Sequence, residues 1–239
     1  MQVSRKRNDP AQYDDLAAQW WDPRGPFVML HWLARARGAL VPPATGDVAT
    51  RDAVLVDLGC GAGLLAPQVS GKGYRHVGVD ITTSALEQAR AHGVVPVRGN
   101  VARVPLRDGC ADVVVAGEIL EHVTDLPGAV REACRLLRPG GLLVIDTIAA
   151  TALARLVAIR IAERLPAVPE GIHDPDLLVD RRVLVRECAR HGVELTLRGI
   201  APSVPDLARW LVRRLDTVRM TSVPTTAVLF QASGRKAVS

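Results

Sequence analysis

Residues 54–63, VLVDLGCGAG, constrain the fold of this chain more than any other segment. An apolar run, typical of a buried strand, ends at Asp57, and glycines follow at positions 59, 61 and 63. Glycine adopts positive φ angles that a side chain resists, so the segment predicts a sharp turn from a strand into a helix, with backbone open to a ligand. A second apolar run, residues 77–80, ends at Asp80. This arrangement predicts an α/β protein with a parallel sheet.

The spacing of the glycines distinguishes two classes of cofactor. The dinucleotide fingerprint G-x-G-x-x-G would need a glycine where Leu64 stands. The chain has D-x-G-x-G-x-G instead, which suits S-adenosylmethionine, because the turn can meet the amino-acid end of the cofactor and Asp80 can bind two ribose hydroxyls. A purely structural glycine turn is the alternative. The predicted cofactor contacts are Asp57, Gly59, Gly61, Gly63 and Asp80, together with Asn100, which follows the third strand and could approach the adenine.

Length and cysteine usage favour a single domain in a reducing compartment. A chain of 239 residues fits one α/β domain with an elaboration, so residues 1–239 are predicted to form one S-adenosylmethionine-dependent methyltransferase domain. The four cysteines are far apart and lack the spacing of a zinc site, which predicts free thiols. No apolar leader follows the charged start, and no run of 18 apolar residues occurs. We therefore expect a cytoplasmic protein without a transmembrane span.

The net charge of +5 does not by itself indicate a nucleic-acid partner. The arginines are scattered over predicted helices, and only two Phe and two Tyr are available to stack on bases. No nucleic acid is therefore expected as a partner. A basic face near an anionic membrane stays open as an alternative.

Short β-branched runs alternate with helical patterns along most of the chain, which predicts a parallel sheet with crossover helices. The expected strands cover residues 53–58, 75–80, 95–99, 112–117, 142–147, 194–200 and 225–231. The expected helices cover residues 63–71, 83–92, 125–137, 175–191 and 205–215. Seven strands in this alternation match the Rossmann-like class I methyltransferase sheet, in which the last strand is antiparallel.

Two segments lie outside this sheet. Residues 10–40 carry Trp20, Trp21 and Trp32 and are expected to form an N-terminal cap of one or two helices. Residues 148–174 are expected to form a helical insert after the fifth strand. One helical face of the insert would carry Ala154, Val157, Ala158, Ile161 and Leu165, with Arg160 and Arg164 on its flank. The insert could be a helix packed on the domain. Alternatively, it could be a lid over an apolar substrate, or a surface that contacts a membrane through residues 151–165.

The fourth strand runs into GEILEH, residues 117–122. In a helical turn Glu118, Glu121 and His122 would share one face, at positions i, i+3 and i+4. Such a triad could bind Mg²⁺ or another divalent metal, which would lower the pKa of a phenolic or catechol hydroxyl. Alternatively, His122 acts alone as a general base, because its ordinary pKa is close to neutrality. A third interpretation is that the Glu-His pair only shapes the loop.

His173 and Asp174 form a second polar pair at the end of the insert. The pair could fold back over the pocket, which makes His173 a catalytic candidate. The alternative is a helix that starts at Pro175 with Asp174 as its N-cap. The remaining histidines, His31, His76, His92 and His191, lie beside predicted helix ends or strand starts and are most simply structural.

Five motifs occur together in this chain: WWD at 20–22 followed by Gly25, Phe27 and Leu30-His31; DLGCGAG at 57–63; ILEHV at 119–123; RPGG at 138–141; and PEGIHD at 169–174. Over residues 11–200 the chain thereby resembles the O-methyltransferases of ubiquinone biosynthesis, which methylate polyprenylated dihydroxybenzene intermediates. The resemblance implies a metal triad of Glu118, Glu121 and His122 and a membrane-contacting insert. It also implies cofactor contacts at Arg37, Gly59, Asp80 and Gly117. Ala34, Arg35 and Ile172 depart from the family pattern, which has Asn, Pro and Thr there.

The sequence thus predicts a methyltransferase that transfers a methyl group from S-adenosylmethionine to a hydroxyl of a phenol, catechol or quinol-like small molecule. Alternatives within enzymes are C-methylation of a quinol ring or methylation in specialised metabolism. A different class is a non-catalytic protein that senses the cofactor. Amino-methylation of nucleic acid is disfavoured, because GEIL stands where that chemistry usually has D/N-P-P-Y/F. A short-chain dehydrogenase is excluded, since neither Tyr13 nor Tyr74 has a lysine four residues later.

Overall fold

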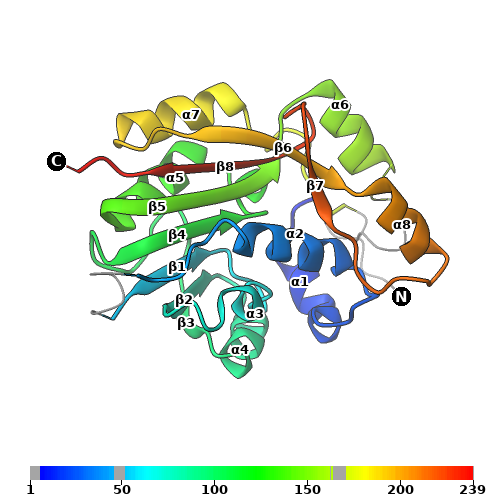
Figure 1. Ribbon diagram of the computed structural model, residues 1–239, viewed down its shortest axis with the longest axis horizontal. Coiled ribbons are helices and arrows are strands. Elements are labelled where there is room, and N and C mark those ends of the chain that lie inside the picture. The colour runs from blue at the N-terminus through cyan, green and yellow to red at the C-terminus, as the bar shows by residue number, and fades with distance from the viewer. Residues whose placement is uncertain (1–5, 46–51, 162, 164–170, 239) are drawn as a thin grey trace.

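The computed structural model describes residues 6–45, 52–161, 163 and 171–238. In these ranges the strands form one sheet with the order β3-β2-β1-β4-β5-β8-β6-β7 (Figure 1). The strands are β1 Val54–Leu58, β2 Arg75–Asp80, β3 Val95–Arg98, β4 Ala111–Gly117, β5 Leu137–Ile148, β6 Thr196–Pro202, β7 Met220–Val223 and β8 Leu229–Arg235. The predicted α/β class and the Rossmann-like order around β1 are confirmed.

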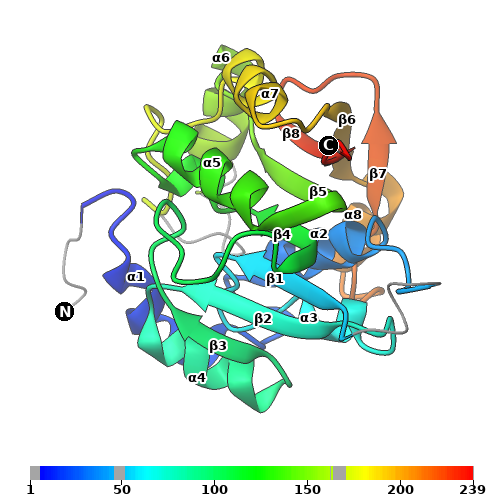
Figure 2. The ribbon, with the colours of Figure 1, turned by 90° about the vertical axis from the view of Figure 1, so that its left-hand side faces the viewer.

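Helices cover both faces of the sheet. They are α1 Ala11–Asp15, η1 Ala17–Gln19, α2 Val28–Gly38, α3 Ala66–Val69, α4 Thr83–Ala91, η3 Leu120–His122, α5 Leu126–Leu136, α6 Ala152–Ala154, η4 Arg155–Ile161, α7 Arg181–Arg190 and α8 Val204–Leu211. Figure 2 shows α5 and α7 on one side of the sheet and α2 and α3 on the other. Figure 1 shows α1, α2, α6 and α8 gathered at one end of the sheet.

The centre of the sheet is buried on both faces, and β4 carries this pattern most clearly. Val114 packs in the cluster that contains Ala133 of α5, whereas Val113 packs in the opposite cluster with Val69 of α3. Alternate strand residues point to opposite faces, so a strand covered by helices on both sides is apolar throughout. This is why the β-branched runs located the parallel strands from sequence.

The antiparallel last strand is confirmed, but its position and the strand count differ from the prediction. The strand expected at residues 225–231 corresponds to β8, which covers Leu229–Arg235 and lies antiparallel between β5 and β6. Over the described residues, the sheet has eight strands instead of the seven expected. A short edge strand, β7, precedes it and pairs with β6. Pro224 follows Val223 directly, and because proline has no amide hydrogen to donate, it ends the edge strand before the chain turns into β8.

The insert after β5 does not form the expected regular α-helix. One turn of α-helix, α6, leads into a π-helix over Arg155–Ile161. The wider π turn shifts the positions that face the protein, so Ala154 and Ala158 are buried while Val157 is 36% exposed. The positions of Arg164 and Leu165 lie outside the described residues.

The helix expected over residues 175–191 is shorter and begins at Arg181. Its N-cap is Asp180, whose side chain accepts hydrogen bonds from the backbone N–H groups of Arg182 and Val183. The interpretation of Asp174 as the N-cap was therefore wrong, because Asp174 forms a turn in which its Oδ1 accepts from the Asp176 N–H at 3.0 Å. Within the described ranges, no helix has both the length and the apolar character needed to cross a bilayer. The four cysteines are free thiols, as predicted.

Candidate active site

The glycine turn after β1 is held by backbone contacts and packs against the N-terminal cap. Gly59 and Gly61 have φ angles of 69° and 49°, and the Gly59 N–H donates to the Val79 carbonyl at 2.8 Å. A Cβ atom added at Gly61 would lie 2.7 Å from the Trp20 ring. The turn therefore requires glycine twice, once for its backbone angle and once for the close approach of an indole.

Of the other two predicted contacts in this motif, Asp57 lines the cavity and Gly63 packs against a helix. Asp57 is buried and lines the cavity, and its Oδ2 lies 3.3 Å from His76 Nε2. Gly63 lies outside the described lining of the cavity. A Cβ atom there would be 3.0 Å from the Ala89 Cα of α4, so Gly63 permits close packing of that helix on the turn.

Asp80 ends β2 with both carboxylate oxygens fixed. Oδ2 accepts from the Gly61 N–H and Oδ1 from the Thr82 N–H, each at 2.9 Å. Burial raises the pKa of Asp80 above its ordinary value, although these backbone hydrogen bonds oppose the shift. Asn100, after β3, also lines the cavity, and its Oδ1 accepts from the Ala102 N–H at 2.8 Å. The structure therefore brings the predicted ribose and adenine residues to the same cavity.

Arg37 of α2 lies across the end of β4 and is clamped by β5. Its guanidinium makes two hydrogen bonds to the Asp146 carboxylate, from Nε at 2.8 Å and from Nη2 at 2.7 Å. A Cβ atom at Gly117 would overlap that guanidinium, which explains the glycine at this strand end. Burial alone would lower the pKa of Arg37, but the charge and hydrogen bonds of Asp146 raise it, so the cation is fixed.

One cavity of about 1010 Å³ joins these residues to an apolar lobe. Its polar side includes the predicted cofactor contacts Arg37, Asp57, Gly59, Gly61, Asp80 and Gly117. Its apolar side includes Phe27, Met29, Trp32, Ile148, Leu207 and Trp210. Trp32 of α2 and Trp210 of α8 meet edge to face, with ring centroids 5.2 Å apart. The cavity can therefore hold a polar cofactor at one end and an apolar acceptor at the other.

The predicted Glu-Glu-His triad is not arranged on one face of a helical turn. Glu118 follows β4 with a φ of 51°, and the 3-10 helix η3 begins only at Leu120. The left-handed residue breaks the helical spacing, so Glu118 and His122 line the cavity while Glu121 is fully buried behind it. Glu121 Oε2 accepts from Thr147 Oγ1 at 2.7 Å. Among the described residues, no three His, Cys, Asp or Glu side chains form a ready metal-ligand set.

The two carboxyl groups lie in an environment that disfavours negative charge. Burial raises the pKa of Glu118 well above its ordinary value, and the neighbouring Glu121 and Asp146 raise it further. Burial likewise raises the pKa of Glu121 to about 7. The Oε1 atom of each glutamate is buried without a hydrogen-bond partner among the described residues. Burial lowers the pKa of His122 to about 3, so this imidazole is neutral at physiological pH.

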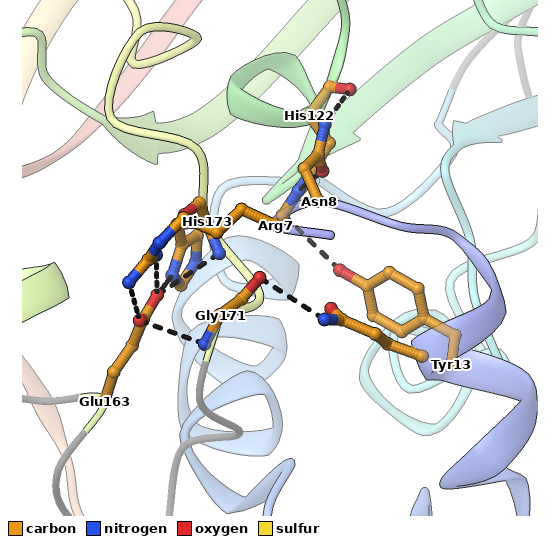
Figure 3. A network of polar contacts seen from close by, with 8 residues as sticks. Arg7, Asn8, Tyr13, His122, Glu163, Gly171 and His173 are labelled. Carbon is orange, nitrogen blue, oxygen red and sulfur yellow. Dashed lines mark hydrogen bonds and ion pairs between the residues drawn. The ribbon is translucent and has the colours of Figure 1, made fainter. Parts of the chain in front are cut away.

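The N-terminal segment before α1 reaches His122, as Figure 3 shows. Asn8 Nδ2 donates to the His122 carbonyl at 3.0 Å, and Asn8 Oδ1 lies 2.6 Å from His122 Nδ1. The Tyr13 hydroxyl lies 3.4 Å from His122 Nε2. Burial raises the pKa of Tyr13 above its ordinary value, so its phenol keeps the proton.

His173 lies beside His122 and is held by Glu163 of the insert. The two imidazole rings stack with centroids 5.4 Å apart. Glu163 Oε1 lies 3.2 Å from His173 Nδ1, and Glu163 Oε2 pairs with Arg7 Nη2 at 3.0 Å. The prediction that the end of the insert folds back over the pocket is thus matched by the position of His173, which lines the cavity.

Four residues of this network were missed from the sequence: Arg7, Asn8, Tyr13 and Glu163. Three of them lie in a charged N-terminal stretch without apolar periodicity, and the fourth is an acid in the insert that belongs to none of the recognised motifs. The only local signal was the presence of polar residues, Asn8 and Asp9, close to the WWD motif. The hydrogen bonds of Arg7, Asn8 and Tyr13 in this network reach more than 100 residues along the chain, whereas Glu163 is only 8 residues from Gly171 and 10 from His173.

Comparisons with known proteins agree with this geometry. Residues 56–145 match the family model described as "Methyltransferase domain". The ubiquinone biosynthesis O-methyltransferase of Colwellia psychrerythraea is 31% identical over 77% of this chain and 81% of its own. The protein of the same name from a Methylobacterium species is 34% identical over 85% of this chain and 88% of its own. A crystal structure of an S-adenosylmethionine-dependent methyltransferase from Thermotoga maritima shares the fold, with a TM-score of 0.65 at 18% identity over 94% and 96% of the two chains.

Proposed function

The chain belongs to the ubiquinone biosynthesis O-methyltransferase family and is an S-adenosylmethionine-dependent methyltransferase, and from this premise we propose that it methylates a hydroxyl of a phenol, catechol or quinol-like small molecule. One observation carries the proposal: a single cavity runs from the glycine turn to an apolar lobe. Glu118 and His122 line the same cavity as the glycine turn and the apolar lobe. An aromatic acceptor in the apolar lobe could therefore meet the methyl group beside an ionisable side chain.

The cofactor is held by the residues at the strand ends. Asp80 binds the ribose hydroxyls through its carboxylate, and the Gly59–Gly61 turn lies against the amino-acid end of the cofactor. Arg37 binds the cofactor carboxylate beside the bare backbone of Gly117, and Asn100 contacts the adenine. The fixed Arg37 cation and the left-handed turn support this assignment, because neither has to reorganise when the cofactor binds.

Methyl transfer then proceeds by in-line substitution. The acceptor oxygen forms a bond to the methyl carbon while the bond between that carbon and the sulfonium sulfur breaks, which leaves S-adenosylhomocysteine. The hydroxyl proton passes to Nε2 of His122, which lines the cavity beside the acceptor lobe. His173 stacks beside this ring and is the second catalytic candidate.

We propose Glu118 as a ligand of a divalent cation such as Mg²⁺, although no three His, Cys, Asp or Glu side chains of the described residues form a ready ligand set. Two buried carboxylate oxygens, Glu118 Oε1 and Glu121 Oε1, lack partners among the described residues, and the pKa values of both groups are raised by burial. A cation held by these carboxylates would offset that cost. When bound, it would supply Lewis-acid polarisation of the acceptor oxygen. Calorimetric titration with Mn²⁺ tests this site, and equal affinity in wild type and the Glu118→Gln variant would argue against it.

Peripheral membrane contact is the proposed role of residues 151–165. Leu153, Leu156 and Val157 are exposed in the described part of this segment, and Arg155 and Arg160 could contact anionic headgroups. Co-sedimentation with vesicles of anionic phospholipid should fall in a Leu153→Glu, Leu156→Glu double variant. Unchanged co-sedimentation would contradict this role.

The main experiment compares catechols with tails of increasing length. Each methylene buried in the apolar lobe contributes about 0.8 kcal/mol, so KM should fall roughly fourfold per methylene until the lobe is filled. Mass and NMR spectra of the product should show a methoxy group. A carbon-methylated ring, or cofactor binding without turnover on any phenol, catechol or quinol, would overturn the proposed function.

A further inference from the structure

The segment before α1 is attached to both sides of the reaction centre. The Asn8 N–H donates to the Gly171 carbonyl at 3.1 Å, and Arg7 Nη1 donates to the His173 carbonyl at 2.5 Å. Figure 3 shows Arg7 directed toward Glu163 and His173 and Asn8 directed toward His122. Two of the residues that this segment contacts, His122 and His173, line the cavity.

The two hydrogen bonds of Asn8 determine which nitrogen of His122 carries the proton. A carbonyl oxygen can only accept, so the Asn8 atom 3.0 Å from the His122 carbonyl must be the amide nitrogen. The amide oxygen then faces His122 Nδ1 at 2.6 Å, and because that oxygen also only accepts, Nδ1 must be the donor. The amide orientation and the imidazole tautomer are thus fixed together.

We infer that Asn8 is a positioning residue that holds His122 in its Nδ1–H tautomer, so that the lone pair of Nε2 is presented to the cavity. The inference rests on the proposed function for its catalytic meaning, but the tautomer itself can be measured without any acceptor. Both Asn8 and His122 line the cavity. In the opposite tautomer Nε2–H would be a donor and could not accept the acceptor's proton.

The hydroxyl of Tyr13 lies next to Nε2 of His122. Its hydroxyl lies 3.4 Å from Nε2, longer than a strong hydrogen bond, and its ring stacks on Trp20 and Phe27. Tyr13 itself lines the cavity. A phenolic hydroxyl therefore already stands beside the lone pair that Asn8 exposes, which is the class of group that the acceptor would bring.

The backbone conformation of Asn8 determines which substitution can test the inference. Its φ angle of 58° is left-handed, which asparagine and glycine tolerate and alanine resists. Asn8→Gly removes the amide without straining the backbone. Asn8→Asp keeps an acceptor for Nδ1–H and loses the donor to the His122 carbonyl. Arg7→Met is the matched control, since it removes another anchor of the same segment without touching His122.

The experiment is a long-range ¹H–¹⁵N correlation spectrum of the full chain with ¹⁵N-labelled histidine, in which a protonated ring nitrogen is distinguished from a bare one. We expect Nδ1 of His122 to be protonated in wild type, Asn8→Asp and Arg7→Met, and the Nε2–H tautomer to appear in Asn8→Gly. With an acceptor, kcat of Asn8→Gly should fall about 10–100-fold while KM for the cofactor stays unchanged.

Two results would overturn the inference. The first is a wild-type spectrum with Nε2–H as the major form of His122. The second is an Asn8→Gly variant that is folded and retains the wild-type tautomer. A failure of the proposed function would look different, because phenolic acceptors would then not be methylated even though the spectra of His122 in the four proteins followed the expected pattern.

Discussion

The buried Arg37–Asp146 pair offers the most direct test of how this site is built. Only 8% of the Arg37 side chain and none of the Asp146 side chain is exposed, and two hydrogen bonds of 2.7 and 2.8 Å join them. Replacing one partner leaves the other charge buried without its counterion, which costs about 3–5 kcal/mol. In a domain of this size that loss corresponds to a decrease in Tm of roughly 6–20 °C. We expect this loss in Arg37→Leu and in Asp146→Leu.

The double variant Arg37→Leu, Asp146→Leu separates the cost of an orphaned charge from the contribution of the pair itself. Replacing a buried ion pair by apolar side chains is often neutral, so the double variant should regain most of the stability that each single variant loses. It should not regain affinity for S-adenosylmethionine, because Arg37 is proposed to bind the cofactor. Urea unfolding measures the first quantity and calorimetric titration the second.

A surface pair supplies the control. Arg135 and Asp108 are 2.6 Å apart, but the Asp108 side chain is 81% exposed, so Asp108→Leu should cost less than about 1 kcal/mol. The reasoning is refuted if Arg37→Leu costs no more than this control. It is also refuted if the losses of the two single variants simply add in the double variant, since additive losses would mean that the charges do not depend on each other.

Three further predictions concern other parts of the molecule. Gly61→Ala should raise the dissociation constant for S-adenosylmethionine more than tenfold, whereas Gly93→Ala, which also has a positive φ but open space around it, should not; equal effects would contradict the steric argument. Glu132 has a lowered pKa because of its hydrogen bonds with Arg135, so it stabilises the fold above its unfolded pKa of about 4.3 and loses that contribution as pH falls through its folded pKa. The stability difference between wild type and Glu132→Gln should therefore shrink from pH 7 to pH 3 in urea titrations, and a constant difference would exclude this linkage. Trp210→Ala should raise KM for a tailed acceptor but not for the cofactor, and a change in both would mean that the two lobes are not independent.

The parts of the fold that depend on local sequence were predictable. Apolar runs located the parallel strands, because a strand covered on both faces must be apolar at nearly every position. The glycine turn was predictable for a related reason: positive φ at Gly59 and Gly61 leaves few other residues compatible with the backbone. Asp80 followed, since strand ends in a parallel sheet meet at one edge, whereas Gly117 was implied only by the resemblance to the ubiquinone-pathway enzymes.

The parts that depend on distant contacts were not predictable. Glu118 has a left-handed φ where it leaves β4, and its N–H is bonded to the Asp146 carbonyl, a distant contact that no local pattern predicts. The π-helix at Arg155–Ile161 likewise follows from how the insert packs, so the regular helical spacing failed there. Asn8 reaches His122 across 114 positions of the chain, and its role exists only in the folded molecule.

One aromatic stack connects the cofactor turn to the reaction centre. Trp20 lies against Gly61, stacks on Phe27 at 4.2 Å and on Tyr13 at 5.7 Å, and the Tyr13 hydroxyl faces His122. A shorter side chain at position 20 would remove the wall of the turn and the support of Tyr13 at once. Trp20→Leu should therefore weaken S-adenosylmethionine binding and lower kcat together, whereas Asn8→Gly should lower kcat alone. Calorimetric titration and turnover on the same preparations measure both quantities, and an effect of Trp20→Leu on only one of them would show that the stack does not couple the two halves of the site.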